Sequence, residues 1–279
     1  MSGERKISST TAKKRITETI QSRFPDVALA PKGKTALYYP NLKTALLPGI
    51  DSELVKADLK QGAGGELRGD LPPFHAPYSS AALCVNVFGP ARTDPTVLEI
   101  YGLSGFSDFA FEKKMPTGIS HPHLDFAATT GSTLLGVESK YLEPLDLKKP
   151  SFEVAYEEAF ANCECPVLNE AYLSVKAGKQ SFERLDVAQL LKHALGLNQK
   201  RNEFESLILG SVYWTPTNAS EFSVYTTMRE ETERFANLLE GSRVQFVSTT
   251  YPQLWDEWEE KKVMPEHLAR VRERYEMEL

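Results

Sequence analysis

Cysteine is scarce in this chain, with only Cys84, Cys163 and Cys165 among 279 residues. An odd and low number of cysteines excludes the disulfide framework that stabilises many small secreted proteins. One residue separates Cys163 from Cys165, a spacing too short for the usual zinc knuckle, and no second Cys or His pair stands nearby. We therefore interpret the Cys-Glu-Cys stretch as incidental to the structure.

Long hydrophobic runs are absent as well. No apolar stretch approaches the roughly 20 residues that cross a membrane. The first 20 residues are polar and basic and lack the apolar segment of a secretory signal. We therefore expect a cytoplasmic protein without a membrane partner.

A positive net charge is also missing, because 38 Asp and Glu outnumber 32 Lys and Arg and leave a net charge of −6. A protein that holds long nucleic acid through its phosphates alone is usually basic. Any role on nucleic acid must therefore depend on local positive charge or on a bound metal ion. The length allows one elaborated domain or two small ones, and the apolar fraction of 41% is ordinary for a soluble globular protein.

The hydrophobic pattern predicts a mixed α/β protein with a central β-sheet flanked by helices. Apolar residues at helical spacing, such as Ile16, Ile20 and Phe24, mark the helices, and alternating apolar residues mark the strands. The predicted helices are 12–24, 51–67, 79–89, 186–197 and 223–241, with a helical tail from 251 onward. The predicted strands are 96–103, 106–114, 123–130, 133–142, 206–214 and 243–251.

Local signals set several of these boundaries. Asp51 is a good N-cap residue for the second helix, which meets a glycine-rich break at 62–65. A serine cap and a glycine stop enclose the helix at 79–89. A Ser-Gly pair between 96–103 and 106–114 predicts a hairpin.

Two charged residues, Glu138 and Lys140, stand near the end of the strand predicted at 133–142. Side chains on a strand alternate between its two faces, so Glu138 and Lys140 project to the same side and Ser139 points away. If the strand at 123–130 is a neighbour, Asp125 can lie close to Glu138.

Two carboxylates and a backbone carbonyl form a hard-oxygen site suited to Mg²⁺. A lysine beside such a site can orient water or stabilise the charge of a phosphate transition state. The alternative interpretation of the Glu-x-Lys pair is a solvated strand edge. We assign Glu143 to such an edge, because it lies beside Pro144 and an odd number of residues from both Glu138 and Lys140.

The stretch HLDFAATTGSTLLGVESKYLE, residues 123–143, resembles the core motif of the PD-(D/E)XK nuclease superfamily. Leu124-Asp125 stands where the motif usually has Pro-Asp, and the second half is Glu-Ser-Lys. Further blocks resemble an uncharacterised bacterial branch of that superfamily, so the similarity spans about residues 45–260. These blocks are GAGGELRG, HAPYSSAALCVNVFGP, DVAQLLKHALGL, SVYWTPTN and YPQLWDEW.

This resemblance implies a restriction-endonuclease-like α/β core and a metal-dependent phosphodiesterase. By matched position, Asp125 and Glu138 would bind Mg²⁺ or Mn²⁺ with the Ser139 carbonyl as a further ligand, and Lys140 would position the attacking water. Many exonuclease-like members add a glutamate from an early helix, for which Glu66 is the candidate. The alternative for Glu66 is a carboxylate at a helix start, favoured by the helix dipole.

Some members also carry a Gln-x-x-x-Tyr pair on the helix after the core. Gln189 matches the first position, and His193 departs from the second. The two lie on one helix face, which makes Gln189 a candidate substrate-binding residue, whereas we interpret His193 as part of a polar helix surface.

The stretch HPHLD offers a different kind of site. His121, His123 and Asp125 alternate and could share a strand face that binds a transition metal. The alternatives are two histidines in a loop at the mouth of the strand, or His123 lining a phosphate pocket. An aromatic set later in the chain could stack on bases, but such residues more often form core. The set comprises Tyr213, Trp214, Tyr251, Trp255 and Trp258.

Three hypotheses follow from these motifs. The first is a Mg²⁺-dependent nuclease acting on DNA, and the second is a catalytically inactive nuclease-like module that binds nucleic acid or a protein partner. The third is a histidine-based metalloenzyme. We divide the chain into an N-terminal tail and helix, residues 1–44, and a nuclease-like domain with a C-terminal helical extension, residues 45–279. The sequence leaves open DNA against RNA, exonuclease against endonuclease, and the oligomeric state.

Overall fold

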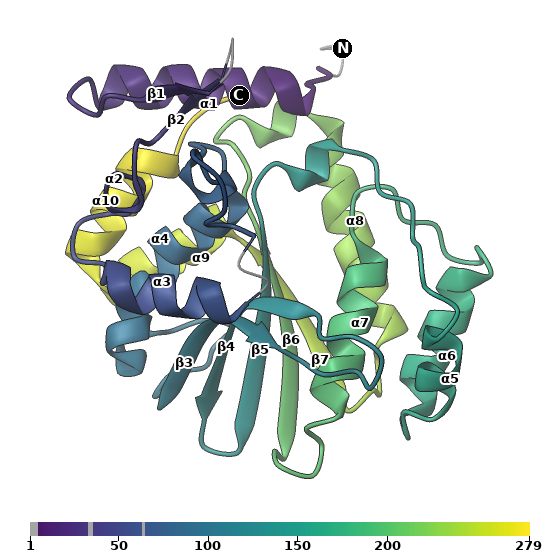
Figure 1. Ribbon diagram of the computed structural model, residues 1–279. Coiled ribbons are helices and arrows are strands. Elements are labelled where there is room, and N and C mark those ends of the chain that lie inside the picture. The colour runs from purple at the N-terminus through teal and green to yellow at the C-terminus, as the bar shows by residue number, and fades with distance from the viewer. Residues whose placement is uncertain (1–4, 33–35, 63–64) are drawn as a thin grey trace.

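The computed structural model describes residues 5–32, 36–62 and 65–279. Its centre is a five-stranded sheet in the order β3-β4-β5-β6-β7 (Figure 1). The first three strands pair antiparallel, whereas β6 and β7 run parallel to β5, so the predicted mixed sheet is confirmed. The strands are β3 Asp108–Lys114, β4 His123–Thr130, β5 Thr133–Lys140, β6 Ser206–Tyr213 and β7 Val244–Thr250.

Helices cover both faces of this sheet (Figure 1). One face packs on a core shared by α3 Ser52–Gln61, α4 Ser80–Thr93, α9 Tyr251–Lys261 and α10 Pro265–Tyr275. The other face packs on α5 Tyr156–Ala161, α6 Pro166–Lys176, α7 Val187–Asn198 and most of α8 Ser223–Leu238. The aromatic set from Tyr213 to Trp258 is buried, which confirms its interpretation as core. None of the helices in the described ranges is both long and apolar enough to cross a bilayer.

The N-terminal helix α1, Ser9–Arg23, is fixed to the rest of the protein by its apolar face. Ala12, Ile16 and Ile20 are at most 1% exposed and join the core that contains α10. A small ribbon of β1 Ala30–Lys32 and β2 Ala36–Tyr38 lies beside α1, followed by α2 Leu42–Ala45 (Figure 1). The apolar spacing thus predicted the helix and its buried face.

The strand predicted at 96–103 is wrong, and with it the hairpin to β3. Asp94 caps a short 3₁₀ turn at Pro95–Val97, and Tyr101 and Gly102 take positive φ angles of 54° and 73°. The chain therefore turns on itself between Ile100 and Leu103. The apolar residues that suggested a strand are core residues of a loop.

The predicted glycine stop of α4 is also wrong, because the helix passes through Gly89 and continues to Thr93. A Cβ at Gly89 would lie 2.8 Å from the side chain of Ile50, so this glycine allows a close approach rather than a helix end. The second predicted helix ends at Gln61, before the glycine-rich break, in which Gly64 lies outside the described residues. Helices α5 and α6 have no counterpart in the sequence prediction.

Candidate active site

The pairing of β4 with β5 stops at Phe126 and Val137, one residue before Asp125 and Glu138. Beyond that point the Asp125 side chain, in place of the β4 backbone, bonds to β5. Its Oδ2 accepts a hydrogen bond from the Ser139 amide at 2.6 Å. Asp125 is therefore held beside β5 by its side chain, where the strands begin to separate. The two strands are neighbours, which was the condition for Asp125 to lie close to Glu138, and the register brings these acidic residues together.

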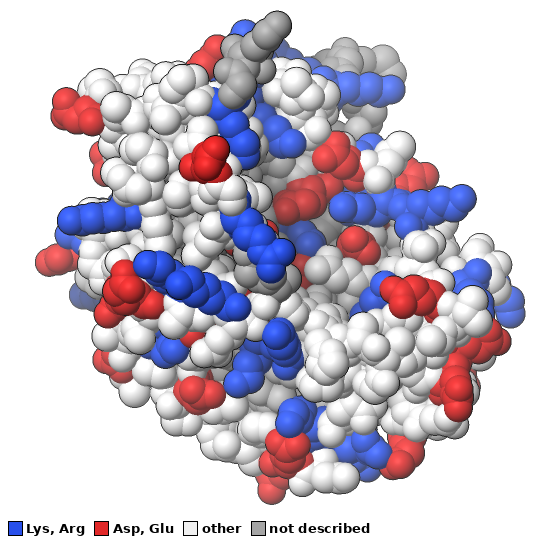
Figure 2. Space-filling view, viewed as in Figure 1, with Lys and Arg blue, Asp and Glu red and all other residues white. Residues whose placement is uncertain are grey.

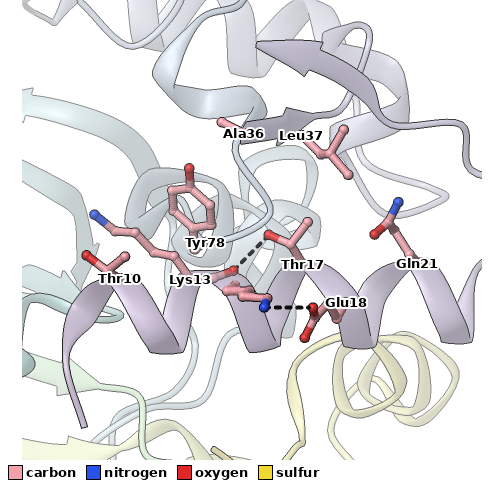
Figure 3. Close-up of a pocket in the computed structure, with 9 residues that line it drawn as sticks. Thr10, Lys13, Thr17, Glu18, Gln21, Ala36, Leu37 and Tyr78 are labelled. Carbon is pink, nitrogen blue, oxygen red and sulfur yellow. Dashed lines mark hydrogen bonds and ion pairs between the residues drawn. The ribbon is translucent and has the colours of Figure 1, made fainter. Parts of the chain in front are cut away.

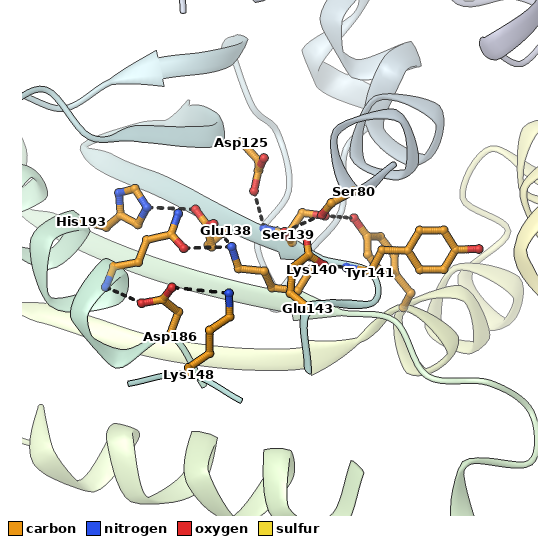
Figure 4. Close-up of polar contacts among 12 residues, drawn as sticks. Ser80, Asp125, Glu138, Ser139, Lys140, Tyr141, Glu143, Lys148, Asp186 and His193 are labelled. Atoms are coloured by element: carbon orange, nitrogen blue, oxygen red, sulfur yellow. Dashed lines mark hydrogen bonds and ion pairs between the residues drawn. The ribbon is translucent and has the colours of Figure 1, made fainter. Parts of the chain in front are cut away.

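Glu138 and Lys140 project to the same side of β5, as strand alternation predicts (Figure 4). The Lys140 Nζ donates to Glu138 Oε1 at 2.5 Å and to Gln189 Oε1 at 2.9 Å. Glu138 is only 3% exposed. Strand β5 and helix α7 thus hold a buried carboxylate, a lysine and an amide in one connected group.

Ser139 lies between these two residues and uses its backbone and side chain in opposite directions. Its hydroxyl contacts the Tyr251 hydroxyl at 2.7 Å on the other face of the sheet. Its carbonyl accepts a hydrogen bond from Ser80 Oγ at 3.0 Å, at the start of α4. The amide and carbonyl of Ser139 therefore both face the side of β5 on which Asp125 lies.

Helix α7 supplies Gln189 and His193 from one face. Asp186 caps this helix and accepts from the Gln189 amide at 3.1 Å, which sets the first turn. His193 is 1% exposed, and its Nε2 lies 2.9 Å from Glu138 Oε2, although the angles do not make a regular hydrogen bond. The interpretation of His193 as part of a polar helix surface is therefore wrong, because the four-residue spacing from Gln189 turns it toward Glu138.

Glu112 is a residue of this site that the sequence pattern did not reveal. The β3–β4 register runs from Phe111–Phe126 to Lys113–Leu124, so Glu112 and Asp125 face each other across an interruption. Glu112 has a φ of 51°, an uncommon backbone conformation for a residue other than glycine and one that clusters at functional sites.

The side chain of Glu112 is held between two neighbours. Its Oε2 lies 3.3 Å from His123 Nδ1, and both side chains are largely buried. A Cβ at Gly62 would lie 2.8 Å from the Cβ of Glu112, so the first glycine of the predicted break makes room for this carboxylate. His123 thus contacts the site at Glu112.

Glu66 and Glu143 line a cavity of about 300 Å³ together with Ser80. Glu66 follows the glycine-rich break and belongs to no helix, so the helix-start alternative for it is wrong. Glu143 accepts from the Tyr141 amide at 2.7 Å and is half-buried. Its assignment to a solvated edge is therefore wrong, because the chain turns back after Lys140 instead of running out into water.

The site concentrates negative charge in a hollow of the surface with Lys and Arg side chains around it (Figure 2). Burial raises the pKa of the Asp125 carboxyl well above its usual range, and the nearby Glu138 adds to the effect. Burial opposes ionisation of Glu138 too, but Lys140 and His193 outweigh it and lower its pKa to about 2. The same carboxylates raise the pKa of Lys140 although burial opposes its charge. Glu138 and Lys140 therefore form an ion pair beside a carboxyl that tends to keep its proton.

Burial, followed by the charges of Glu66 and Glu138, raises the pKa of Glu112 to about 7. A carboxyl whose pKa is higher in the folded than in the unfolded protein contributes its full stability at pH values below the unfolded pKa. This contribution is lost as the pH rises through the folded pKa. We expect Glu112→Gln to raise the melting temperature by several degrees at pH 8 in EDTA and to change it little at pH 4. Thermal unfolding between pH 4 and 8 checks this, with the exposed Glu170→Gln as control. A difference in melting temperature between Glu112→Gln and wild type that does not change with pH would contradict the role of the Glu112 charge.

The donors in this site are suited to a hard cation. Asp125 and Glu138 supply carboxylates and Ser139 a carbonyl on the same side of β5, and Glu138 Oε2 has no regular hydrogen bond. In the described ranges, no three or more His, Cys, Asp or Glu side chains form a group that could hold a metal ion. This holds for the histidine-based site and equally for Asp125, Glu138 and Glu66 as three side-chain ligands. Two carboxylates and a backbone carbonyl still match the oxygen donors that Mg²⁺ takes.

A family model described as REase-ARP, "Restriction Endonuclease associating with ARP", matches residues 11–276. The match runs from α1 to the end of the chain's last helical segment and includes every strand of the central sheet. No curated protein matches the chain. No solved structure matches it either.

Proposed function

Because the chain belongs to the family of restriction endonucleases associating with ARP, we propose that it is a nuclease that hydrolyses DNA with a divalent metal ion. The observation that carries the proposal is the meeting of Asp125, Glu138 and Lys140 where β4 and β5 separate. These are the side chains that the resemblance to the PD-(D/E)XK superfamily singles out. The family match supports a nuclease, and the acidic pair with its lysine supports phosphodiester hydrolysis.

Asp125, Glu138 and the Ser139 carbonyl are the proposed ligands of a Mg²⁺ or Mn²⁺ ion. When bound, such an ion would supply a Lewis acid for the phosphate and lower the pKa of a water molecule. It would also compensate the repulsion between Asp125 and Glu138, which adds to the effect of burial in raising the pKa of Asp125. Glu66 is a proposed ligand from the adjoining cavity rather than from β4 or β5.

The remaining side chains act on the nucleophile and on the scissile phosphate. Lys140 keeps its proton next to Glu138 and can donate from Nζ to an attacking water or to a phosphate oxygen. Gln189 Oε1 holds that Nζ in place at 2.9 Å. His193 lies against the second oxygen of Glu138 and thereby limits the positions of this carboxylate.

A catalytically inactive module that binds nucleic acid or a protein partner is the second candidate function. The family description speaks of an association with ARP, which is the observation in favour of a binding module. A fold alone does not decide between the two, because related folds support different functions. Retention of the two carboxylates and the lysine in one group favours the nuclease.

Metal binding separates these two candidates. We expect Asp125→Asn to weaken Mn²⁺ binding by at least about tenfold, since it removes one charged oxygen ligand. Titration calorimetry of wild type and variant measures this effect. Asp186→Asn is the matched control, because it changes a nearby carboxylate that caps α7 and leaves a residue type that also caps helices. Absence of Mn²⁺ binding in the wild type, or equal binding in wild type and Asp125→Asn, would favour the inactive module.

A further inference from the structure

A cavity of about 660 Å³ lies between helix α1, strand β2 and Tyr78 (Figure 3). One face of α1 lines it with side chains that can form hydrogen bonds, namely Thr10, Lys13, Thr17 and Gln21. These positions are three or four residues apart, so they follow one stripe along the helix. Lys14 and Glu18 also line the cavity, so this wall is polar and carries charges of both signs.

This cavity adjoins a smaller one that contains Glu66, a proposed metal ligand. Lys13 and Tyr78 line it and also line the smaller cavity that contains Glu66 and Ser80. Ser80 in turn donates to the carbonyl of Ser139. A chain-like ligand lying along α1 would therefore pass directly to the side of β5 on which Asp125 lies.

The N-terminal region that carries α1 has a charge opposite to that of the whole protein, whereas the smaller cavity is also lined by Glu66, Glu143 and Asp146. Residues 5–32 contain seven Lys and Arg against two Asp and Glu, in a chain whose net charge is −6. Lys14, on the cavity wall, is 76% exposed at its side chain, and among the described residues its one ion-pair partner is the exposed Glu18, at 3.7 Å. The N-terminal region therefore supplies the local positive charge that a nucleic-acid ligand requires in an acidic protein.

Two tyrosines with lysines beside them stand where the two cavities meet. The rings of Tyr38 and Tyr78 contact edge to face, with centroids 6.2 Å apart. Lys13 Nζ lies 5.4 Å from the Tyr78 ring centroid, and Lys32 Nζ lies 4.3 Å from that of Tyr38. Both tyrosines are half-buried, so part of each side chain is open to a ligand. Aromatic rings next to cations are the means by which proteins hold unpaired nucleotides, whose bases stack while lysines contact phosphates.

We propose that the α1–Tyr78 groove binds a single-stranded segment of the nucleic-acid substrate and leads it to the catalytic residues. The inference rests on the proposed nuclease function. Paired bases hide their faces in the duplex, so the tyrosines select a strand that is already unpaired. The substrate class is accordingly DNA with a single-stranded end or gap rather than a continuous duplex.

The test measures binding in EDTA, where metal-dependent cleavage cannot occur. A fluorescent oligo-dT strand and a blunt duplex are titrated with wild type, with Lys13→Glu/Lys14→Glu and with Tyr78→Ala. Lys179→Glu/Lys200→Glu is the matched control, since it reverses two lysines that follow α6 and α7, away from α1 (Figure 1). Like the pair in α1, one of these lysines has a nearby glutamate partner and the other has none that the structure describes. Thermal unfolding of each variant establishes that it is folded.

We expect wild type to bind oligo-dT more tightly than the duplex, and the lysine variant to bind oligo-dT at least about tenfold more weakly. Its salt dependence should be shallower by about 1.4, because each phosphate contact to a single strand contributes about 0.7 to the slope. Tyr78→Ala should weaken oligo-dT binding and leave the salt slope unchanged. The control should bind as wild type does.

Equal oligo-dT binding by wild type and folded groove variants would overturn the inference, even if the wild type cleaves DNA. Wild type that binds no oligo-dT, or that prefers the duplex, would overturn the inference too. The groove would then be assigned to a protein segment instead of a nucleic-acid strand. Groove-dependent binding of oligo-dT without cleavage in Mg²⁺ would support the groove and reject the nuclease. The two proposals can therefore fail separately.

Discussion

Replacing Lys140 with methionine is expected to lower the rate of Mg²⁺-dependent DNA cleavage by roughly 10²–10³-fold, the usual effect of removing one donor to a developing negative charge. Lys140 Nζ donates a hydrogen bond to Glu138 Oε1 at 2.5 Å and so lies directly at the proposed metal ligands. Methionine keeps most of the length of the side chain but cannot donate to water or phosphate. Initial rates on DNA with a single-stranded end measure the effect.

The control for this experiment is Lys148→Met. Lys148 Nζ lies 4.0 Å from Oδ2 of Asp186, the N-cap residue of α7. Lys148 makes no contact with Glu138 that the structure describes. Cleavage by this variant should remain within a few-fold of wild type. A folded Lys140→Met variant that cleaves at the wild-type rate would remove Lys140 from the catalytic group.

Loss of Arg92 is expected to have the largest effect on stability. Its guanidinium donates to Asp58 through Nε at 2.5 Å and Nη2 at 3.0 Å, and Asp58 is only 4% exposed. Asp58 also accepts from the Phe111 amide at 3.1 Å, next to the unusual backbone of Glu112. Arg92→Met would leave a buried carboxylate without its cation, which costs about 3–5 kcal/mol of unfolding free energy.

Chemical denaturation of Arg92→Met measures this loss. The double variant Arg92→Met/Asp58→Asn should recover part of it, because a neutral amide oxygen can still accept from Phe111 and no charge stays buried. A loss below about 1 kcal/mol in Arg92→Met would place this pair with ordinary surface ion pairs. A double variant no more stable than the single one would show that the buried charge is not the cause.

The strands that carry the candidate site could be predicted because their residues follow simple rules. The apolar runs around Asp125 and Glu138 gave β4 with its observed bounds and β5 to within two residues of its end. Period-two alternation then placed Glu138 and Lys140 on one side. The helical spacing of Gln189 and His193 likewise held, although which face of α7 meets β5 depends on tertiary packing and was misjudged for His193.

Glu112 could not be predicted, because a one-residue irregularity in β3 reverses the alternation on which such predictions depend. Glu143 was misassigned for a related reason, since the turn after Lys140 brings its carboxylate back to the Tyr141 amide. The groove along α1 joins residues far apart in the sequence, and only the fold brings Lys13 next to Tyr78. The missed residues are thus those whose positions depend on turns and long-range contacts.

Anomalous diffraction from crystals soaked in Mn²⁺ shows whether Asp125, Glu138 and Ser139 bind one metal ion together. We predict one strong peak about 2.1 Å from an oxygen of Asp125, an oxygen of Glu138 and the carbonyl of Ser139, with Lys140 beside it. Crystals of Asp125→Asn should lack this peak. A wild-type crystal with no Mn²⁺ at this position, or with Mn²⁺ bound by His121 and His123 instead, would contradict a metal site at Asp125 and Glu138.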